Sequence, residues 1–89
     1  MNKPRELIFT EKVKEDYKNL PAHIKKKFKK QIRFLSSNPK HPSLKIHRIE
    51  GHKNRWEFYI DDTYRGTFSI QGGIFVLRRA GTHKILKNP

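Results

Sequence analysis

The spacing of hydrophobic residues changes once along this chain of 89 residues, and that change constrains the fold more than any other feature. Between Pro21 and Ser36, apolar side chains recur at the spacing of one helix face: Ile24, Phe28, Ile32 and Leu35. Beyond a proline-bracketed loop the spacing becomes two, as in Trp56, Phe58 and Ile60. Helices in the first half and a sheet in the second half are therefore predicted, which is an α+β fold.

The first twenty residues predict a strand followed by a short helix. Residues 5–10 form an apolar, extended segment, and Thr10 is a suitable N-cap. Acidic residues lie near the start of this helix, and Val13, Tyr17 and Leu20 fall on one face. Pro21 can begin a second helix, which the segment around Pro39 ends. The two helices are expected to form an antiparallel hairpin.

Three strands are predicted after the loop. An irregular extended segment from Leu44 to Ile49 precedes the first of them, at residues 56–60. Turns at Asp61-Asp62 and at Gln71-Gly72-Gly73 separate it from two further strands. The predicted architecture is an N-terminal strand, a helix hairpin and a three-stranded antiparallel meander in one sheet (β-α-α-β-β-β). Residues 1–89 are expected to form a single domain.

The chain carries a formal net charge of +13, with 21 Lys or Arg residues against 8 Asp or Glu residues. No acid occurs between Tyr17 and Ile49, nor after Asp62. This excess is larger than the net charge of about 2–8 that keeps a small domain in solution. It predicts a polyanionic partner such as RNA, DNA or an acidic protein segment. A merely solvated lysine face is the alternative.

Other compositional features exclude several classes of protein. The sequence contains no cysteine, which rules out disulfide scaffolds and thiolate zinc sites. No apolar run approaches the roughly 20 residues that span a bilayer, and the N-terminus lacks the apolar core of a signal peptide. A soluble cytoplasmic protein with no membrane partner is expected.

Polar residues on the predicted strands indicate a site on the sheet face away from the helices. Arg65 is out of phase with Tyr64 and Phe68, so its side chain is expected on that face, beside Glu57 and Tyr59. The last strand, or the turn after it, brings Arg79 and His83 to the same end of the sheet. The extended segment before residues 56–60 adds Lys45, His47 and Arg48. The result would be a basic cleft.

These groups suit cleavage of RNA by its own 2′-hydroxyl group, a reaction that needs no metal. Glu57 would be the base, His83 the acid and Arg65 the group that stabilises the phosphorane, with Tyr59 completing the catalytic set. Five residues are predicted to bind RNA: Lys45, His47, Arg48, Arg55 and Arg79. The acids are too scattered to resemble a metal-ligand set, and no cofactor is expected.

Each assignment has a simpler alternative. Arg65 could pair with Asp61 or Asp62 across the hairpin, and the sole role of Glu57 could be to neutralise the charge of Arg55. His83 could be a helix-capping or an exposed residue.

The residues that carry a family resemblance span nearly the whole chain: Leu20-Pro21, Ser37-Asn38-Pro39, Leu44 to Gly51, Trp56 to Ile60, Tyr64-Arg65 with Phe68, and Arg79-Ala80-Gly81-Thr82-His83. In order and spacing they resemble the RelE/ParE superfamily of toxins from type II toxin–antitoxin modules. The resemblance implies a small sheet with an N-terminal helix hairpin. It also implies an mRNA endoribonuclease, commonly acting in the ribosomal A site, with Arg65 and His83 in its active site.

The same resemblance implies a cognate antitoxin that covers the basic surface. Two other functions remain open within it: a ParE-like inhibitor of DNA gyrase, and a non-catalytic RNA- or ribosome-binding module. Many ribonucleases of the family have Lys or Arg on the strand that carries Glu57 and Tyr59 here. Several have an aromatic residue in the region where this chain has Ile85 and Leu86.

Overall fold

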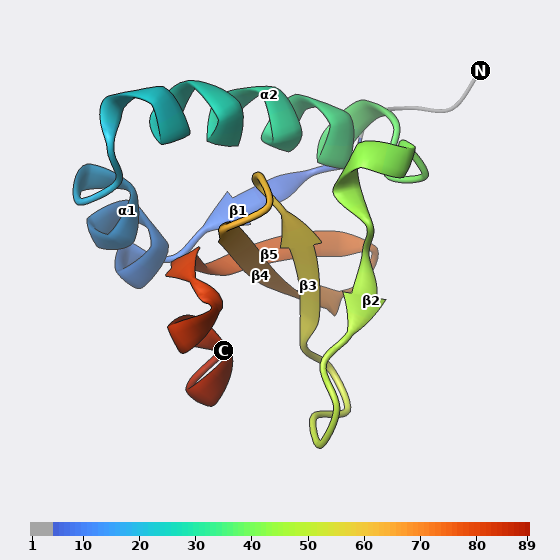
Figure 1. Ribbon diagram of the computed structural model, residues 1–89. Helices are drawn as coiled ribbons and strands as arrows, with labels where there is room; N and C mark the ends of the chain where they lie inside the picture. Colours follow the sequence, from blue (N-terminus) through green and yellow to red (C-terminus); the bar gives the residue numbers. More distant parts are fainter. Residues whose placement is uncertain (1–4) are drawn as a thin grey trace.

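The computed structural model describes residues 5–89, which form an α+β fold around one sheet (Figure 1). The elements follow in this order: β1 (Leu7–Phe9), α1 (Glu11–Lys18), α2 (Ala22–Ser37), η1 (Pro42–Leu44), β2 (His47–Arg48), β3 (Trp56–Tyr59), β4 (Tyr64–Gln71), β5 (Ile74–Thr82) and η2 (His83–Lys87). Among these residues, no helix is both long and apolar enough to cross a membrane.

The five strands form one sheet in the order β1-β5-β4-β3-β2. β1 runs parallel to β5, whereas the other neighbours are antiparallel. The predicted strand, helices and antiparallel meander are therefore confirmed. The sheet has one more strand than predicted, because the segment before the meander pairs with β3. In that pair, His47 lies opposite Glu57 and Arg48 lies opposite Trp56.

Local sequence signals set where both helices begin. The hydroxyl of Thr10 accepts a hydrogen bond from the N–H of Val13 (3.2 Å), which caps α1 as predicted. Pro21 directly precedes α2, where a backbone N–H would have no helical partner. Figure 1 shows α2 lying along the sheet and α1 turned across one end of α2, so the two helices do not run side by side.

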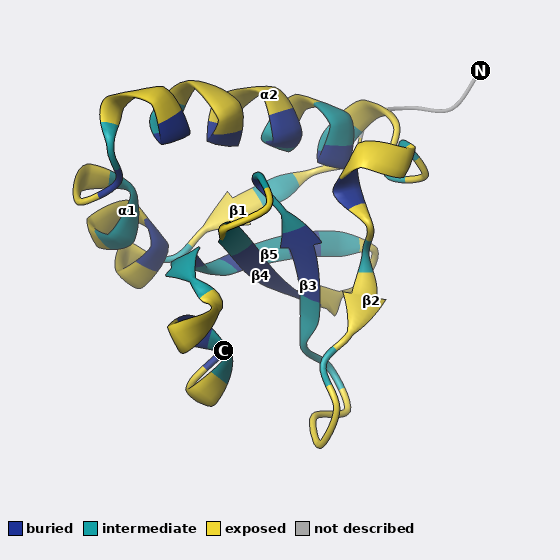
Figure 2. Cartoon of the chain, in the orientation of Figure 1, coloured by how far each residue is buried: buried dark blue, intermediate teal, exposed yellow. Residues whose placement is uncertain are grey.

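The buried positions of α2 lie on the side that faces the sheet (Figure 2), and all of them are apolar except Gln31. Ile32 was predicted on the buried stripe, but it is only half-buried, and Gln31 is 3% exposed instead. The amide Nε2 of Gln31 donates to the carbonyl oxygen of Tyr59 (2.8 Å). It also lies 3.3 Å from the carbonyl oxygen of Ser43. A buried amide is stable here because its donor is satisfied, and it ties α2 to β3.

The sheet face away from α2 is more covered than the sequence suggested. Glu57, Thr67 and Ser69 project from this face, yet each is at most 5% exposed. The segment after β5 covers part of it: the Thr67 hydroxyl donates to the carbonyl oxygen of Pro89 (3.1 Å). Arg79 Nη1 donates to the carbonyl oxygen of Asn88 (3.1 Å). The face is therefore a partly filled surface rather than an open concave one.

Candidate active site

A buried carboxylate lies at the centre of the candidate site. The side chain of Glu57 is only 6% exposed, and its Oε1 lies 3.0 Å from Nε2 of His47 and 3.8 Å from Nε of Arg65. The strand register explains this grouping, because His47 and Thr67 are the cross-strand neighbours of Glu57 on the same face. The structure thus places Glu57 beside Arg65, as the sequence predicted, and adds a histidine that had been assigned only to RNA binding.

Arg65 is held in one orientation by its surroundings. Its Nη1 donates to the carbonyl oxygens of Asp61 (2.7 Å) and Tyr64 (3.2 Å). Its guanidinium carbon lies 3.5 Å from the centroid of the Tyr59 ring, in a cation–π contact. The side chain is 14% exposed, and Nη2 has no hydrogen-bond partner within residues 5–89. A fixed guanidinium with one free nitrogen is suited to bind an anionic oxygen.

Asp61 organises the turn that holds Arg65, but its carboxylate does not pair with Arg65. Its Oδ1 accepts hydrogen bonds from the N–H groups of Thr63 (2.8 Å) and Tyr64 (2.7 Å). Burial acts to raise the pKa of Asp61. These hydrogen bonds, together with the charges of Lys27 and His23, outweigh burial and hold the pKa below its usual value of 3.8. The turn is therefore stabilised by the ionised form.

Asp61→Ala is expected to lower the free energy of unfolding at pH 7 by about 1 kcal/mol, because two backbone donors lose their acceptor. A carboxyl group with a lowered folded-state pKa stabilises the protein above its unfolded pKa, and that stability is lost as the pH falls through the folded value. The difference from the wild type should therefore shrink below about pH 3.8. Urea unfolding at several pH values measures it. Asp62→Ala, at an exposed neighbour, is the control and should leave the free energy of unfolding nearly unchanged at pH 7.

Lys45 joins the site from the edge of the sheet. It has φ of 46°, the left-handed region that non-glycine residues rarely adopt, and its Nζ lies 4.9 Å from the Tyr59 ring centroid. Its carbonyl oxygen lies 3.1 Å from Nδ1 of His47, whose Nε2 faces Glu57. The two ring nitrogens of His47 therefore lie near two oxygen atoms, one of Lys45 and one of Glu57.

Solved structures with this fold come from bacteria and archaea. YafQ from E. coli is 18% identical, with a TM-score of 0.76 over 92% of this chain and 97% of that one. A chain of the RelB–RelE antitoxin–toxin complex from Methanococcus jannaschii is 26% identical, with a TM-score of 0.74 over 91% of this chain and 95% of that one. The YoeB/ParE toxin from Agrobacterium tumefaciens is 19% identical, with a TM-score of 0.73 over 88% of this chain and 98% of that one.

The chain has the fold of the RelE/ParE superfamily. Comparison of its sequence with protein-family models gave no match, and comparison with curated proteins gave none either. The RelE-like fold is thus recognised through the arrangement of strands and helices, while the identities of individual residues have diverged widely. Roles at particular positions in this RelE-like chain therefore have to be argued from its own geometry.

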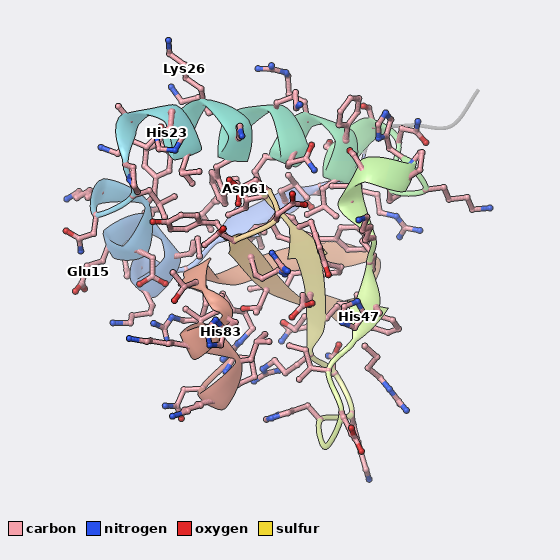
Figure 3. All side chains as sticks on the ribbon, viewed as in Figure 1. Glu15, His23, Lys26, His47, Asp61 and His83 are labelled. Atoms are coloured by element: carbon pink, nitrogen blue, oxygen red, sulfur yellow. The ribbon has the colours of Figure 1, made fainter. Side chains whose placement is uncertain are left out.

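The predicted acid, His83, lies apart from the carboxylate cluster. It is the exposed first residue of η2, and Thr82, not His83, is the N-cap of that segment. Thr82 pairs with Tyr64, so His83 follows β5 at the end of the sheet where Arg65 lies. Figure 3 shows His83 and His47 separated across the sheet. Within residues 5–89, His83 makes no hydrogen bond or ion pair, so its imidazole is free to contact a substrate.

The remaining predicted RNA-binding residues are divided between the two faces of the RelE-like sheet. Arg48 pairs with Trp56, which packs against the core, so its register position is on the face opposite to His47. Arg79 forms an ion pair with Asp16 of α1 (2.8 Å) besides its bond to Asn88. The structure therefore places His47 and Arg65 beside Glu57 and Lys45 beside the Tyr59 ring, and it ties Arg79 to α1.

Sequence reasoning missed the contact between His47 and Glu57. They are ten positions apart in the sequence, and nothing in the spacing between them signals a contact. Only the register of β2 against β3 brings them together, and β2 itself is two residues long. Within the part of the chain that the structure describes, no three His, Asp or Glu side chains are grouped closely enough to hold a metal ion.

Proposed function

We propose that this protein is the toxin of a type II toxin–antitoxin module and that it cleaves mRNA in the cytoplasm, on the ribosome, without a metal ion. The observation that carries the proposal is the fixed Arg65 guanidinium beside the Glu57–His47 pair on one face of a strongly basic domain. Supporting it, structures with the same fold include toxins crystallised with the antitoxins DinJ and RelB.

In the proposed reaction the 2′-oxygen of one nucleotide attacks the adjacent phosphorus. Glu57 takes the proton of that hydroxyl on Oε2, the oxygen left without a partner because Oε1 is held by His47 and Arg65. The free Nη2 of Arg65 stabilises the negative charge of the phosphorane. The bond from phosphorus to the 5′-oxygen then breaks, and His83 gives a proton to that oxygen. The products are a 2′,3′-cyclic phosphate and a 5′-hydroxyl end.

Tyr59 and Lys45 would align the substrate in this mechanism. The Tyr59 ring stacks on Arg65, and its centroid lies 4.9 Å from Lys45 Nζ, so one ring contacts both cations. Lys45 would bind the phosphate next to the cleaved bond. His47 would orient the Glu57 carboxylate rather than contact the reacting atoms.

An apolar groove supports the second part of the proposal, an antitoxin partner. Its volume is about 660 Å³, and it lies where α1 turns across the end of α2, with Phe9 of β1 also lining it. Phe9 is exposed, as is its neighbour Ile8 (37% and 46%). Four cations line the groove together with its apolar floor: Lys14, Lys18, Lys29 and Arg33. Such a surface is complementary to an amphipathic acidic segment, so we assign the groove to the antitoxin.

The test is controlled expression in bacteria followed by primer extension on translated mRNA. The wild-type protein should arrest growth and produce cuts in register with the reading frame. Glu57→Gln and His83→Gln should each remove the cuts while the protein stays folded. Intact mRNA together with trapped gyrase–DNA complexes would contradict the proposal and support a gyrase inhibitor. Growth arrest with intact mRNA and no such complexes would leave only a ribosome-binding module.

A further inference from the structure

A second group of unpaired polar side chains lies on the same sheet face as Glu57. Two buried side-chain atoms have no hydrogen-bond partner within residues 5–89: Oγ of Ser69 and Nε of Arg78. Buried donors in folded proteins are almost always satisfied, and an unsatisfied one costs about 1–3 kcal/mol. Arg78 is therefore an arginine whose Nε has no acceptor among the described residues.

A bulge in β5 creates this arrangement. Thr67 pairs with Arg79, whereas the next residue of β4, Phe68, pairs with Leu77, so Arg78 is the extra residue. Leu77 and Ala80 are both buried in the core (0% and 4% exposed). The two arginines between them consequently project away from the core. They differ in one respect, because Arg79 has an acidic partner in Asp16 while Arg78 has none.

Arg55 increases the positive charge around Arg78. Burial and the nearby charge of Arg55 together lower the pKa of Arg78. Neither guanidinium forms a salt bridge within the described residues, and the only side-chain hydrogen bond of Arg55 is to the carbonyl oxygen of Asn54 (2.8 Å). Two neighbouring cations without a carboxylate between them repel each other, and an anion bound between them would remove that repulsion.

We infer that Arg55 and Arg78 form a second phosphate-binding subsite, which takes a backbone phosphate of the RNA strand flanking the cleaved bond. The choice of RNA as the ligand rests on the proposed function, whereas the arrangement of the residues does not. Arg55 lies directly before β3 and two residues before Glu57. In extended backbone the two side chains therefore project from the same face of the sheet, about 7 Å apart. On its other side, Arg78 lines a cavity of about 250 Å³ that Arg79 and Lys12 also line.

The inference predicts that Arg78 matters for longer RNA and not for short RNA. A fully 2′-O-methylated single strand of about eight nucleotides is a suitable probe, because it cannot be cleaved and is long enough to reach both sites. Arg78→Gln should weaken its binding about tenfold, as expected for loss of hydrogen bonds to a charged group. The slope of log affinity against log salt should fall by about 0.7. Binding of a 2′-O-methylated dinucleotide should not change.

Two further variants make the test specific. Lys26→Gln removes one positive charge from the exposed surface of α2, and it should leave both the affinity and the salt slope nearly unchanged. Ser69→Ala keeps the charge and removes a hydroxyl that is fully buried, so it should change neither the binding of the longer strand nor the slope. Fluorescence anisotropy measures all of these, and thermal melts confirm that each variant is folded.

Equal losses in Arg78→Gln and Lys26→Gln would overturn the subsite, since the effect would then be one of net charge alone. Unchanged binding in a folded Arg78→Gln variant would overturn it as well. Because the probe cannot be cleaved, the outcome is independent of whether the protein is a nuclease. A selective loss in Arg78→Gln would support the subsite even if translated mRNA remained intact, and in that case only the proposed function would fail.

Discussion

Arg65→Ala is expected to slow mRNA cleavage by about 10²–10³-fold, the usual loss when one preorganised donor to a developing negative charge is removed. The effect should be large because the guanidinium is already fixed by the carbonyl oxygen of Asp61 and by the Tyr59 ring before substrate binds. Its donor geometry therefore needs no rearrangement during the reaction. Single-turnover cleavage of ribosome-bound mRNA, with enzyme in excess, measures the rate.

Arg65→Lys is the matched control for charge. Lysine keeps the positive charge but lacks the planar fork that bonds Asp61 and stacks on Tyr59, so it should recover only a small part of the rate. Both variants need thermal melts, because Arg65 also contributes to the β3–β4 turn. A folded Arg65→Ala variant that cleaves at the wild-type rate would exclude Arg65 from the active site.

Gly66→Ala is expected to have the largest effect on stability, a loss of about 3 kcal/mol or more in the free energy of unfolding. Gly66 lies opposite Phe58 in the β3–β4 register, and the Phe58 ring covers it. An added Cβ would overlap the ring atoms Cζ and Cε1 and lie 2.9 Å from Cε2. Phe58 is fully buried, so its ring has no space to move into. Urea unfolding measures the loss.

The smaller side chain in Phe58→Leu should relieve this overlap. Gly66→Ala is thus expected to cost less in the Phe58→Leu background than in the wild type, giving a non-additive double-mutant cycle. If the two substitutions lowered the free energy of unfolding additively, the overlap with the Phe58 ring would not be the reason that position 66 needs glycine.

The helices and the main strands could be predicted because their signals are local. Thr10 as a cap, Pro21 before α2 and the alternation around Phe58 each act within a few residues of their own position. The buried Gln31 was not predictable in this way. Its burial depends on the carbonyl oxygen of Tyr59, a partner 28 positions along the chain.

Part of the candidate site could be predicted because its sequence signal, the alternation along the strands, is also local. Alternation placed Arg65, Glu57 and Tyr59 on one face, and the ladder between β3 and β4 brings them together. The His47–Glu57 contact depends on pairing of a two-residue strand, and the position of Arg78 away from the core depends on a bulge. Neither register nor bulge has a strong signal in a single sequence.

The chemistry of the new RNA ends tests the central claim most directly. Fragments of translated mRNA produced by the purified protein should be analysed by mass spectrometry, with Glu57→Gln protein as the blank. Attack by the 2′-hydroxyl predicts a 2′,3′-cyclic phosphate on the upstream fragment and a 5′-hydroxyl on the downstream one. Fragments that end in a 3′-hydroxyl and a 5′-phosphate would show attack by water and contradict the mechanism, and uncut mRNA would contradict the nuclease itself.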